Sequence, residues 1–274
     1  MSATTNAVDE ATAPSGTPRR ATRTFAVTGS ASGIGAAVFR RLRRSGAQVM
    51  GVDVREGDIT ADLSRPEGRR RALEAVAERC EGRLDGAVVC AGLGPQVHPV
   101  ETLPSVNYFG ALEILDGLLP MLERGEAPAA VAIASNSAGI TPVHAPLLER
   151  LLAGDEEGAR GAAASLDGAT VYGTGKLALT RALRRRAGPW GERGVRLNAV
   201  APGPVDTPLL AGGLEDPVLG PLIEALPVPL GRRATPDEIA AAVGVLLDPA
   251  HGFVHGSVLF VDGGTDALLR PDAL

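Results

Sequence analysis

Short apolar runs rich in β-branched residues alternate with amphipathic stretches along most of this 274-residue chain. Such alternation is typical of βαβ units, in which helices cover both faces of a parallel sheet. The apolar runs predict strands at Arg23–Thr28, Gln48–Asp53, Gly57–Ala61, Leu84–Ala91, Ala129–Ser135, Val195–Ala201 and Ser257–Val261. The amphipathic stretches predict helices at Gly33–Ser45, Pro66–Arg79, Val100–Leu122, Val171–Ala187 and Pro236–Leu247. We therefore expect one α/β domain.

Two stretches, 138–169 and 202–233, break this alternation. Long irregular segments that follow parallel strands are where an open α/β sheet builds its ligand site. The first contains four leucines at helical spacing before a glycine: Leu147, Leu148, Leu151 and Leu152, then Gly154. This spacing predicts one or two short helices in a segment at about 140–169, with a solvated loop as the alternative.

The composition fits a chain that buries one sizeable core, because 45% of its residues are hydrophobic and 22% are charged. A net charge of −5, with lysines and arginines scattered, argues against a nucleic-acid partner. The apolar runs are too short and interrupted to span a bilayer. Residues 1–22 are rich in Ala, Thr, Ser and Pro and lack a signal-peptide pattern, so we expect a disordered leader on a cytoplasmic protein.

The two cysteines, Cys80 and Cys90, have no spacing typical of a disulfide framework or a zinc site. We expect buried thiols and no metal.

A glycine-rich turn joins the first predicted strand to the first helix, as Thr28-Gly29-Ser30-Ala31-Ser32-Gly33-Ile34-Gly35. Gly29 permits a tight turn, Gly33 lets the backbone approach a diphosphate, and Gly35 lets helix and strand pack closely. The helix N-terminus then offers amide hydrogens to the phosphates. The residues predicted to bind there are Gly29, Ser32, Gly33, Ile34 and Gly35.

Asp53 ends the second predicted strand, where a carboxylate can accept hydrogen bonds from both hydroxyls of an adenosine ribose. A 2′-phosphate would meet like charge there, so Asp53 favours NAD over NADP. Arg55 could instead hold that phosphate, or could point to solvent or lie over the adenine face. Asp62 and Leu63 are candidates for the adenine, although Asp62 could equally cap a helix.

Cys90-Ala91-Gly92 ends the fourth predicted strand, where small residues let the backbone lie against a cofactor. A tight turn explains Gly92 equally well.

Tyr172 and Lys176 stand four residues apart in a helix of small and apolar residues, so phenol and ammonium share one face. A neighbouring cation is expected to lower the pKa of the phenol, which would let Tyr172 exchange a proton near neutral pH. Ser135, which ends the fifth predicted strand, is the candidate hydroxyl beside them, with Ser137 as its rival.

Together these residues resemble the short-chain dehydrogenase/reductase family, with its TGxxxGxG turn, acidic end of the second strand, serine after the fifth strand and YxxxK helix. The resemblance covers about residues 23–264 and includes Asn107, Asn198–Gly203, Thr207 and Val261–Gly264. It implies a single doubly wound Rossmann-type domain over 23–274, with a seven-stranded parallel sheet of order 3-2-1-4-5-6-7.

The resemblance also implies roles. Tyr172 would be the general acid and base, Ser135 would bind the carbonyl oxygen, and Lys176 would hold the nicotinamide ribose. Asn107 would support a water that carries protons away from Lys176. The remaining residues implied around the nicotinamide are Pro202, Gly203, Val205 and Thr207.

Ser135 and Tyr172 are 37 positions apart, more than most of the family allows, so the segment at about 140–169 is an insertion. A bacterial branch, the 3α-hydroxysteroid dehydrogenase/carbonyl reductases, is similar in this respect and also around Cys90–Gln96, Ser105–Gly110 and Gly231–Arg233. In that branch the insertion obstructs a tetramer face, and this resemblance implies a homodimer.

The segment at about 205–230 is rich in leucine, which is typical of a lid over an apolar substrate. We expect an NAD-dependent enzyme that interconverts a secondary alcohol and a ketone on a hydrophobic ring compound, plausibly a steroid. The alternatives are an aromatic (coniferyl-type) alcohol dehydrogenase and a non-catalytic NAD(H)-binding regulator.

Overall fold

The computed structural model describes residues 22–273, so all of the predicted leader except Thr22 lies outside the described residues. A seven-stranded parallel sheet has the order β3-β2-β1-β4-β5-β6-β7, which confirms the expected topology. The strands are β1 (Thr24–Thr28), β2 (Gln48–Asp53), β3 (Ile59–Thr60), β4 (Gly86–Val89), β5 (Ala129–Ile133), β6 (Arg196–Pro202) and β7 (Val258–Val261). The order reverses between β1 and β4, so the crevice beyond their carboxyl ends is the expected ligand position.

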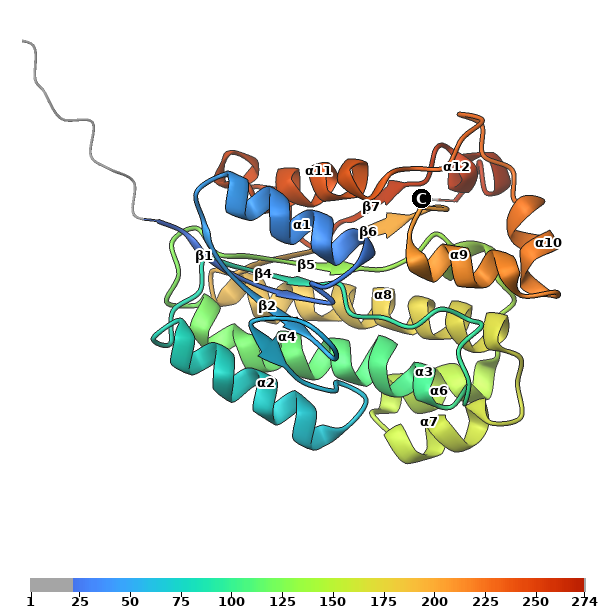
Figure 1. The fold of residues 1–274 in the computed structure, drawn as a ribbon, viewed down its shortest axis with the longest axis horizontal. Coiled ribbons are helices and arrows are strands. Elements are labelled where there is room, and N and C mark those ends of the chain that lie inside the picture. The colour runs from blue at the N-terminus through green and yellow to red at the C-terminus, as the bar shows by residue number, and fades with distance from the viewer. Residues whose placement is uncertain (1–21, 274) are drawn as a thin grey trace, which may run out of the picture.

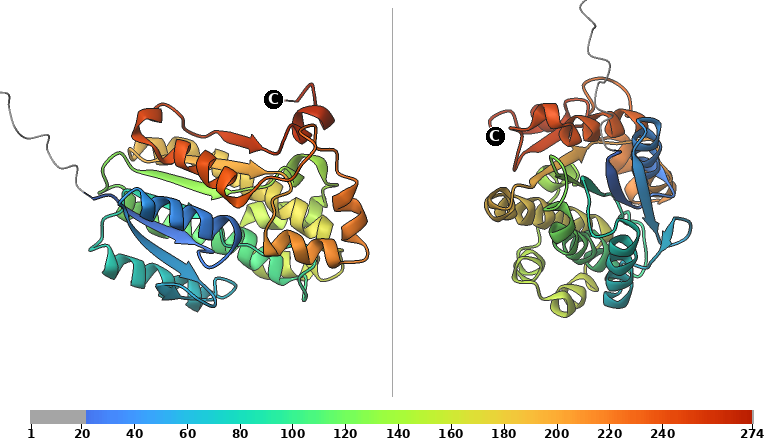
Figure 2. Two further views of the ribbon diagram at one scale, coloured as in Figure 1. Left: turned by 45° about the horizontal axis from the view of Figure 1, so that its top comes forward. Right: turned by 90° about the vertical axis from the view of Figure 1, so that its left-hand side faces the viewer.

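Helices cover both faces of this sheet (Figures 1 and 2). One face packs on α1 (Gly33–Arg44) and α11 (Pro236–Leu247), and the other on α2 (Pro66–Arg79), α4 (Ala111–Leu122) and α8 (Gly168–Glu192). Side chains alternate along a strand, so a strand contributes residues to the hydrophobic cores on both faces of the sheet. In β5, for example, Val131 packs with the α1 and α11 side, whereas Ala130 and Ala132 pack with the α4 and α8 side.

The predicted helix at Val100–Leu122 is interrupted in its winding. It begins as the short α3 (Thr102–Pro104), continues as a π-helical segment, η1 (Ser105–Gly110), and becomes regular only in α4. Wide π turns are frequent at functional sites, and this one carries Asn107.

The predicted insertion does contain short helices. After α5 (Ser137–Ile140) come α6 (Ala145–Ala153) and α7 (Glu156–Ala163). Leu147, Leu148 and Leu151 are buried, as their spacing predicted, and Gly154 ends α6 in the left-handed conformation, with φ of 78°. The solvated-loop alternative is therefore wrong.

The second irregular stretch also contains helices that the sequence pattern missed, α9 (Pro208–Glu215) and α10 (Leu219–Glu224). They lie beyond the carboxyl ends of the strands, at the right in Figure 1. A short 3₁₀ helix, η2 (Pro249–His251), and α12 (Thr265–Leu269) complete the described elements. Among residues 22–273, no helix is long and apolar enough to cross a membrane.

Candidate active site

Ser135 and Tyr172 meet at the carboxyl end of β5. β5 ends at Ile133, two residues before Ser135, and α8 begins at Gly168, four residues before Tyr172. A side-chain hydrogen bond joins Ser135 to the Tyr172 phenol. The insertion separates them in sequence, but the fold returns α8 to the side of β5.

Ser137, the rival serine, lies behind Ser135. Its hydroxyl and its amide both donate to the Ser135 hydroxyl oxygen, at 2.9 and 3.2 Å. The structure therefore supports the choice of Ser135 as the hydroxyl next to the phenol and gives Ser137 a supporting position.

Lys176 is buried one turn further along α8, with 6% of its surface exposed. Its Nζ donates to the Ile133 carbonyl at 2.8 Å and lies 5.7 Å from the centre of the Tyr172 ring. Burial lowers the pKa of Lys176 to about 8, because the charged form is poorly solvated there.

The pKa of Tyr172 moves opposite to our expectation. Burial raises it, and only the hydrogen bond with Ser135 works in the lowering direction. The charge of Lys176 was expected to lower this pKa, but the low solvation of a phenol between packed elements has the larger effect. In this structure the protonated phenol is therefore the favoured form.

The side chain of Asn107 forms two hydrogen bonds with the loop that follows β4. Its side-chain oxygen accepts from the Leu93 amide at 2.7 Å, and its amide nitrogen donates to the Leu93 carbonyl at 2.9 Å. These two hydrogen bonds fix η1 against the loop. Support of a proton-carrying water by Asn107 remains a prediction.

The glycine-rich turn has the geometry that its sequence predicted. Gly29 and Gly33 have positive φ angles of 68° and 50°, which side chains rarely adopt. A Cβ on Gly35 would lie only 2.0 Å from the Gly29 carbonyl oxygen, so helix and turn can pack this closely only without a side chain. The turn and the exposed Ser32 before α1 leave an open backbone cradle of the kind that fits a diphosphate.

Asp53 ends β2 beside this turn. One carboxylate oxygen accepts from the Ala31 amide at 3.0 Å, and the other accepts from the Arg55 amide at 3.2 Å. The Arg55 residue itself is exposed. A carboxylate anchored at the turn suits ribose hydroxyls, which donate to it, and opposes a phosphate.

The end of β4 is held against β1 by Thr28, a residue whose side-chain role the sequence did not reveal. Its hydroxyl accepts from the amides of Cys90 and Ala91, each at 3.1 Å. A Cβ on Gly92 would lie 3.3 Å from the Asn107 side-chain oxygen, so the absence of a side chain at Gly92 lets Asn107 approach the backbone closely. Cys80 is buried, as expected, whereas Cys90 is only partly buried as a residue, although burial of its thiol raises the pKa to about 12.

The segment after β6 closes the same crevice. β6 ends at Pro202, and Gly203 passes within 2.8 Å of Asp262, measured from the position a Cβ would take. Val205 is buried. Thr207 caps α9 by accepting from the Leu210 amide at 3.2 Å, and it approaches Gly33. The start of α9 therefore faces the glycine-rich turn.

Asp62 and Leu63, the residues predicted to contact the adenine, follow β3. The Asp62 carboxylate accepts from the Ser64 amide at 2.9 Å, an interaction within its own loop. The Leu63 side chain is buried, and its carbonyl accepts from Arg69. Sequence reasoning missed Arg69, because an arginine in the run Arg69-Arg70-Arg71 reads as a solvated helix residue.

Two family models match the chain in succession. The model described as short chain dehydrogenase matches residues 23–146, and the one described as Enoyl-(Acyl carrier protein) reductase matches residues 158–266.

Individual proteins are also similar over most of their length. The chain is 46% identical over 249 residues to a 3-alpha-hydroxysteroid dehydrogenase/carbonyl reductase of Comamonas testosteroni, which covers 89% of this chain and 97% of that protein. It is 34% identical over 263 residues to a cis-4-hydroxycyclohexanecarboxylate dehydrogenase of Sinomonas cyclohexanicum, with 90% and 98% covered. Among solved structures, the 3-alpha-hydroxysteroid dehydrogenase from Pseudomonas sp. B-0831 complexed with NADH matches with a TM-score of 0.89 and 47% identity, over 92% of this chain and 100% of that one.

Proposed function

The chain belongs to the short-chain dehydrogenase/reductase family of oxidoreductases, and we propose that this member uses NAD(H) to interconvert a secondary alcohol and a ketone on a hydrophobic ring compound. A steroid hydroxyl is the specific substrate class we propose. The observation that carries the proposal is the contact between Ser135 and Tyr172 with Lys176 buried beside them.

These three side chains can manage the charge that carbonyl reduction creates. The nicotinamide supplies or accepts the hydride when the cofactor is bound. As negative charge develops on the substrate oxygen, Ser135 donates a hydrogen bond to it and the Tyr172 phenol gives it a proton. In the direction of oxidation the same phenol, once deprotonated, takes the hydroxyl proton. Lys176 places a cation 5.7 Å from the centre of the Tyr172 ring and would hold the nicotinamide ribose when the cofactor is bound.

The choice of NAD rests on Asp53. Its carboxylate is tied to the Ala31 amide of the glycine-rich turn, so a 2′-phosphate at the ribose position would lie beside a fixed negative charge. The complex of the related Pseudomonas enzyme with NADH supports the same choice. We propose that Gly29, Ser32, Gly33, Ile34 and Gly35 hold the diphosphate, and that Pro202, Gly203, Val205 and Thr207 border the nicotinamide.

The substrate class rests on the α9–α10 segment, residues 208–224. Leu209 and Leu222 are exposed there, and Gln96 ties α9 to the loop after β4 by donating to the Leu209 carbonyl at 3.0 Å. An apolar flap anchored over the crevice suits a ring compound. Two relatives are named for a hydroxysteroid and for a hydroxycyclohexane carboxylate, both ring alcohols, which supports this choice.

We also propose a homodimer. α6 packs beside α8, and in the branch of the family that this chain resembles the insertion obstructs a tetramer face. β7 is an edge strand of the described sheet, and its Leu259 and Phe260 are each 38% exposed. Light scattering coupled to size exclusion tests this, since a tetramer would contradict it.

A substrate panel tests the proposed activity. The purified protein is mixed with NAD and with steroid, aromatic or alicyclic alcohols, and NADH formation is followed by absorbance. We expect turnover to be fastest with hydroxysteroids. Preference for coniferyl-type alcohols would support the aromatic alternative. NADH binding without turnover on any alcohol or ketone would indicate a regulator.

A further inference from the structure

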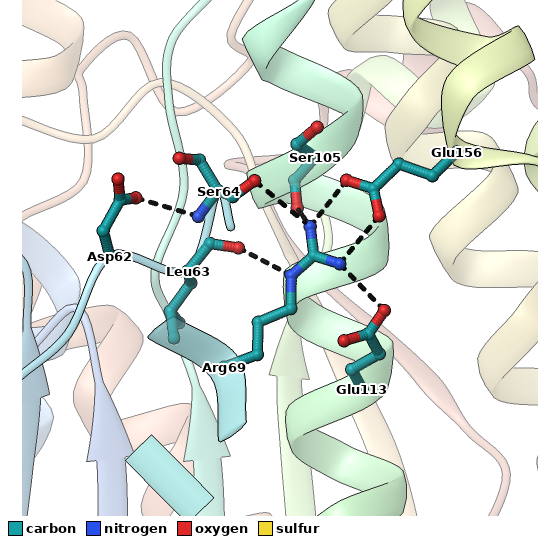
Figure 3. Close-up of polar contacts among 7 residues, drawn as sticks. All are labelled: Asp62, Leu63, Ser64, Arg69, Ser105, Glu113 and Glu156. Carbon is teal, nitrogen blue, oxygen red and sulfur yellow. Dashed lines mark hydrogen bonds and ion pairs between the residues drawn. The ribbon is translucent and has the colours of Figure 1, made fainter. Parts of the chain in front are cut away.

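Arg69 is a buried guanidinium with its hydrogen-bond donors distributed over several elements. It comes from α2 and is 1% exposed. Nε donates to the Leu63 carbonyl at 2.8 Å, and Nη2 donates to the Ser105 carbonyl at 2.8 Å. Figure 3 shows the side chain at the centre of this cluster, between α2, η1 and α7. A buried charge needs such a complete set of partners.

The two carbonyls bound by Arg69 belong to the proposed cofactor region. Leu63 stands in the loop that we assign to the adenine, and Ser105 opens η1, which carries Asn107. A Cβ on Gly110 would lie 2.9 Å from the Leu63 oxygen and 3.1 Å from the Ser105 oxygen. The absence of a side chain at Gly110 therefore lets these two carbonyls converge on one cation.

The insertion supplies the matching anion. Glu156, the first residue of α7, accepts from Nη1 and Nη2 of Arg69 at 2.8 and 2.7 Å in a bidentate pair. Burial acts to raise the pKa of Glu156, but hydrogen bonds from Arg69 and Ser105, together with the charges of Arg69 and Arg160, leave the pKa below its ordinary value. Glu113 of α4 adds a single contact at 2.8 Å and is half exposed.

Elsewhere the insertion stands apart from the adenine loop. A cleft of about 850 Å³ separates Glu157 and Arg160 of α7 from Ser64 and Arg65. Across this gap, the Arg69–Glu156 pair connects the two surfaces directly.

We propose that Arg69 and Glu156 are positioning residues through which the insertion sets the affinity for the adenosine half of the cofactor, an inference that rests on the proposed NAD site. Glu156 holds the guanidinium, and the guanidinium holds the Leu63 carbonyl and so the Asp62–Leu63 loop. The insertion thereby acts on cofactor binding and not only on assembly.

This arrangement predicts a change in KM for NAD with little change in kcat. Asn107 has its own double hydrogen bond with Leu93, so the catalytic end of η1 keeps its anchor when Arg69 moves. Within residues 22–273, no hydrogen bond or ion pair joins Ser135, Tyr172 or Lys176 to Arg69 or Glu156.

AMP is the probe that isolates the adenosine half. We expect Glu156→Ala to weaken AMP and NADH binding by a similar factor of about tenfold, as loss of a charge-assisted pair would. Glu156→Gln, which keeps one acceptor, should weaken both by about threefold. Nicotinamide mononucleotide binding and kcat should stay within about twofold of the wild type. Glu157→Gln is the matched control, because Glu157 is exposed on the same turn of α7. This variant should bind AMP with the affinity of the wild type.

A purely structural role for the pair would lower the melting temperature of Glu156→Ala and leave the AMP affinity of the folded fraction unchanged, and this result would overturn the proposal. If the variant does not fold, hydrogen exchange on the wild-type protein decides. AMP should then slow amide exchange in α7 as well as in residues 62–65, and protection of 62–65 alone would also overturn it. Failure of the wild type to bind AMP would instead contradict the cofactor site itself.

Discussion

The Ser137 hydroxyl donates to the Ser135 hydroxyl oxygen at 2.9 Å, and the Ser137 amide donates to the same oxygen at 3.2 Å. A hydroxyl has two acceptor lone pairs and one hydrogen. With both lone pairs engaged by Ser137, the hydrogen of Ser135 is left to point elsewhere, and the bond with Tyr172 shows the direction. Ser135 is thereby prepared to donate to an oxygen that lies beside the phenol.

The two serines should therefore differ sharply when substituted. Ser135→Ala removes the donor to the substrate oxygen and should lower kcat by about 10²–10³. Ser137→Ala keeps the hydrogen bond from the backbone amide of residue 137 to the Ser135 hydroxyl oxygen. It should therefore lower kcat by only about threefold to tenfold. Steady-state kinetics with saturating NADH measure both. A larger loss for Ser137→Ala than for Ser135→Ala would mean that Ser137, and not Ser135, contacts the substrate.

Tyr172→Phe should nearly abolish turnover, by at least about 10³, because it removes the proton donor while keeping the ring. The phenylalanine still fills the space beside Lys176, so NADH binding should change by less than about twofold. Fluorescence titration with NADH provides that control. Near-normal activity in this variant would contradict the whole catalytic assignment.

The raised pKa of Tyr172 predicts opposite pH dependences for the two directions. Below its pKa the phenol is protonated, as ketone reduction requires, so kcat/KM for reduction should be flat between pH 6 and 8. Alcohol oxidation requires the deprotonated form, whose fraction rises about tenfold per pH unit in that range. Initial rates in both directions test this. An oxidation rate already level at pH 6 would show that the phenol titrates with a lowered pKa.

The fold followed from local patterns that tertiary contacts reinforce. The central strands β4 and β5 are buried on both faces, as their apolar runs predicted, and Leu147, Leu148 and Leu151 at helical spacing marked α6 correctly. α9 and α10 were missed because their sequences are rich in glycine and proline, which hide helical periodicity. The π turn at Ser105–Gly110 was also missed, since apolar spacing alone does not separate it from a regular helix.

The site was predictable where a motif fixes backbone shape or side-chain spacing, as in the glycine-rich turn and the pair Tyr172 and Lys176. It was not predictable where burial decides the chemistry. The direction of the Tyr172 pKa depends on how much water the packed elements exclude. Arg69 gave no signal either, because its partners Glu113 and Glu156 lie 44 and 87 residues away in sequence.

Asp53→Ala should relax cofactor choice. Removing the carboxylate takes away repulsion of a 2′-phosphate and also the hydrogen bonds to the ribose, so NADP should improve while NAD weakens. We expect the ratio of kcat/KM for NAD over NADP to fall by about 10²-fold. Asp58→Ala is a useful comparison, since Asp58 binds the Gly51 amide at 2.8 Å nearby and should affect stability more than cofactor choice. A wild-type preference for NADP would contradict this prediction.

Lys176 should leave a recognisable mark on the pH dependence of stability. Its folded pKa of about 8 lies below the ordinary lysine value, so between pH 8 and 10.5 the unfolded chain binds the proton more strongly than the folded protein. The free energy of unfolding of the wild type should therefore rise with pH through this range, by about 3 kcal/mol from this group. Lys176→Met removes the titration but leaves the Ile133 carbonyl without its donor, a loss that does not depend on pH. Urea denaturation at pH 7 and pH 10 measures the free energy of unfolding of both proteins. The wild-type value minus the variant value should become more positive as pH rises. A difference that stays constant with pH would mean that Lys176 keeps an ordinary pKa and is better solvated than its burial in α8 implies.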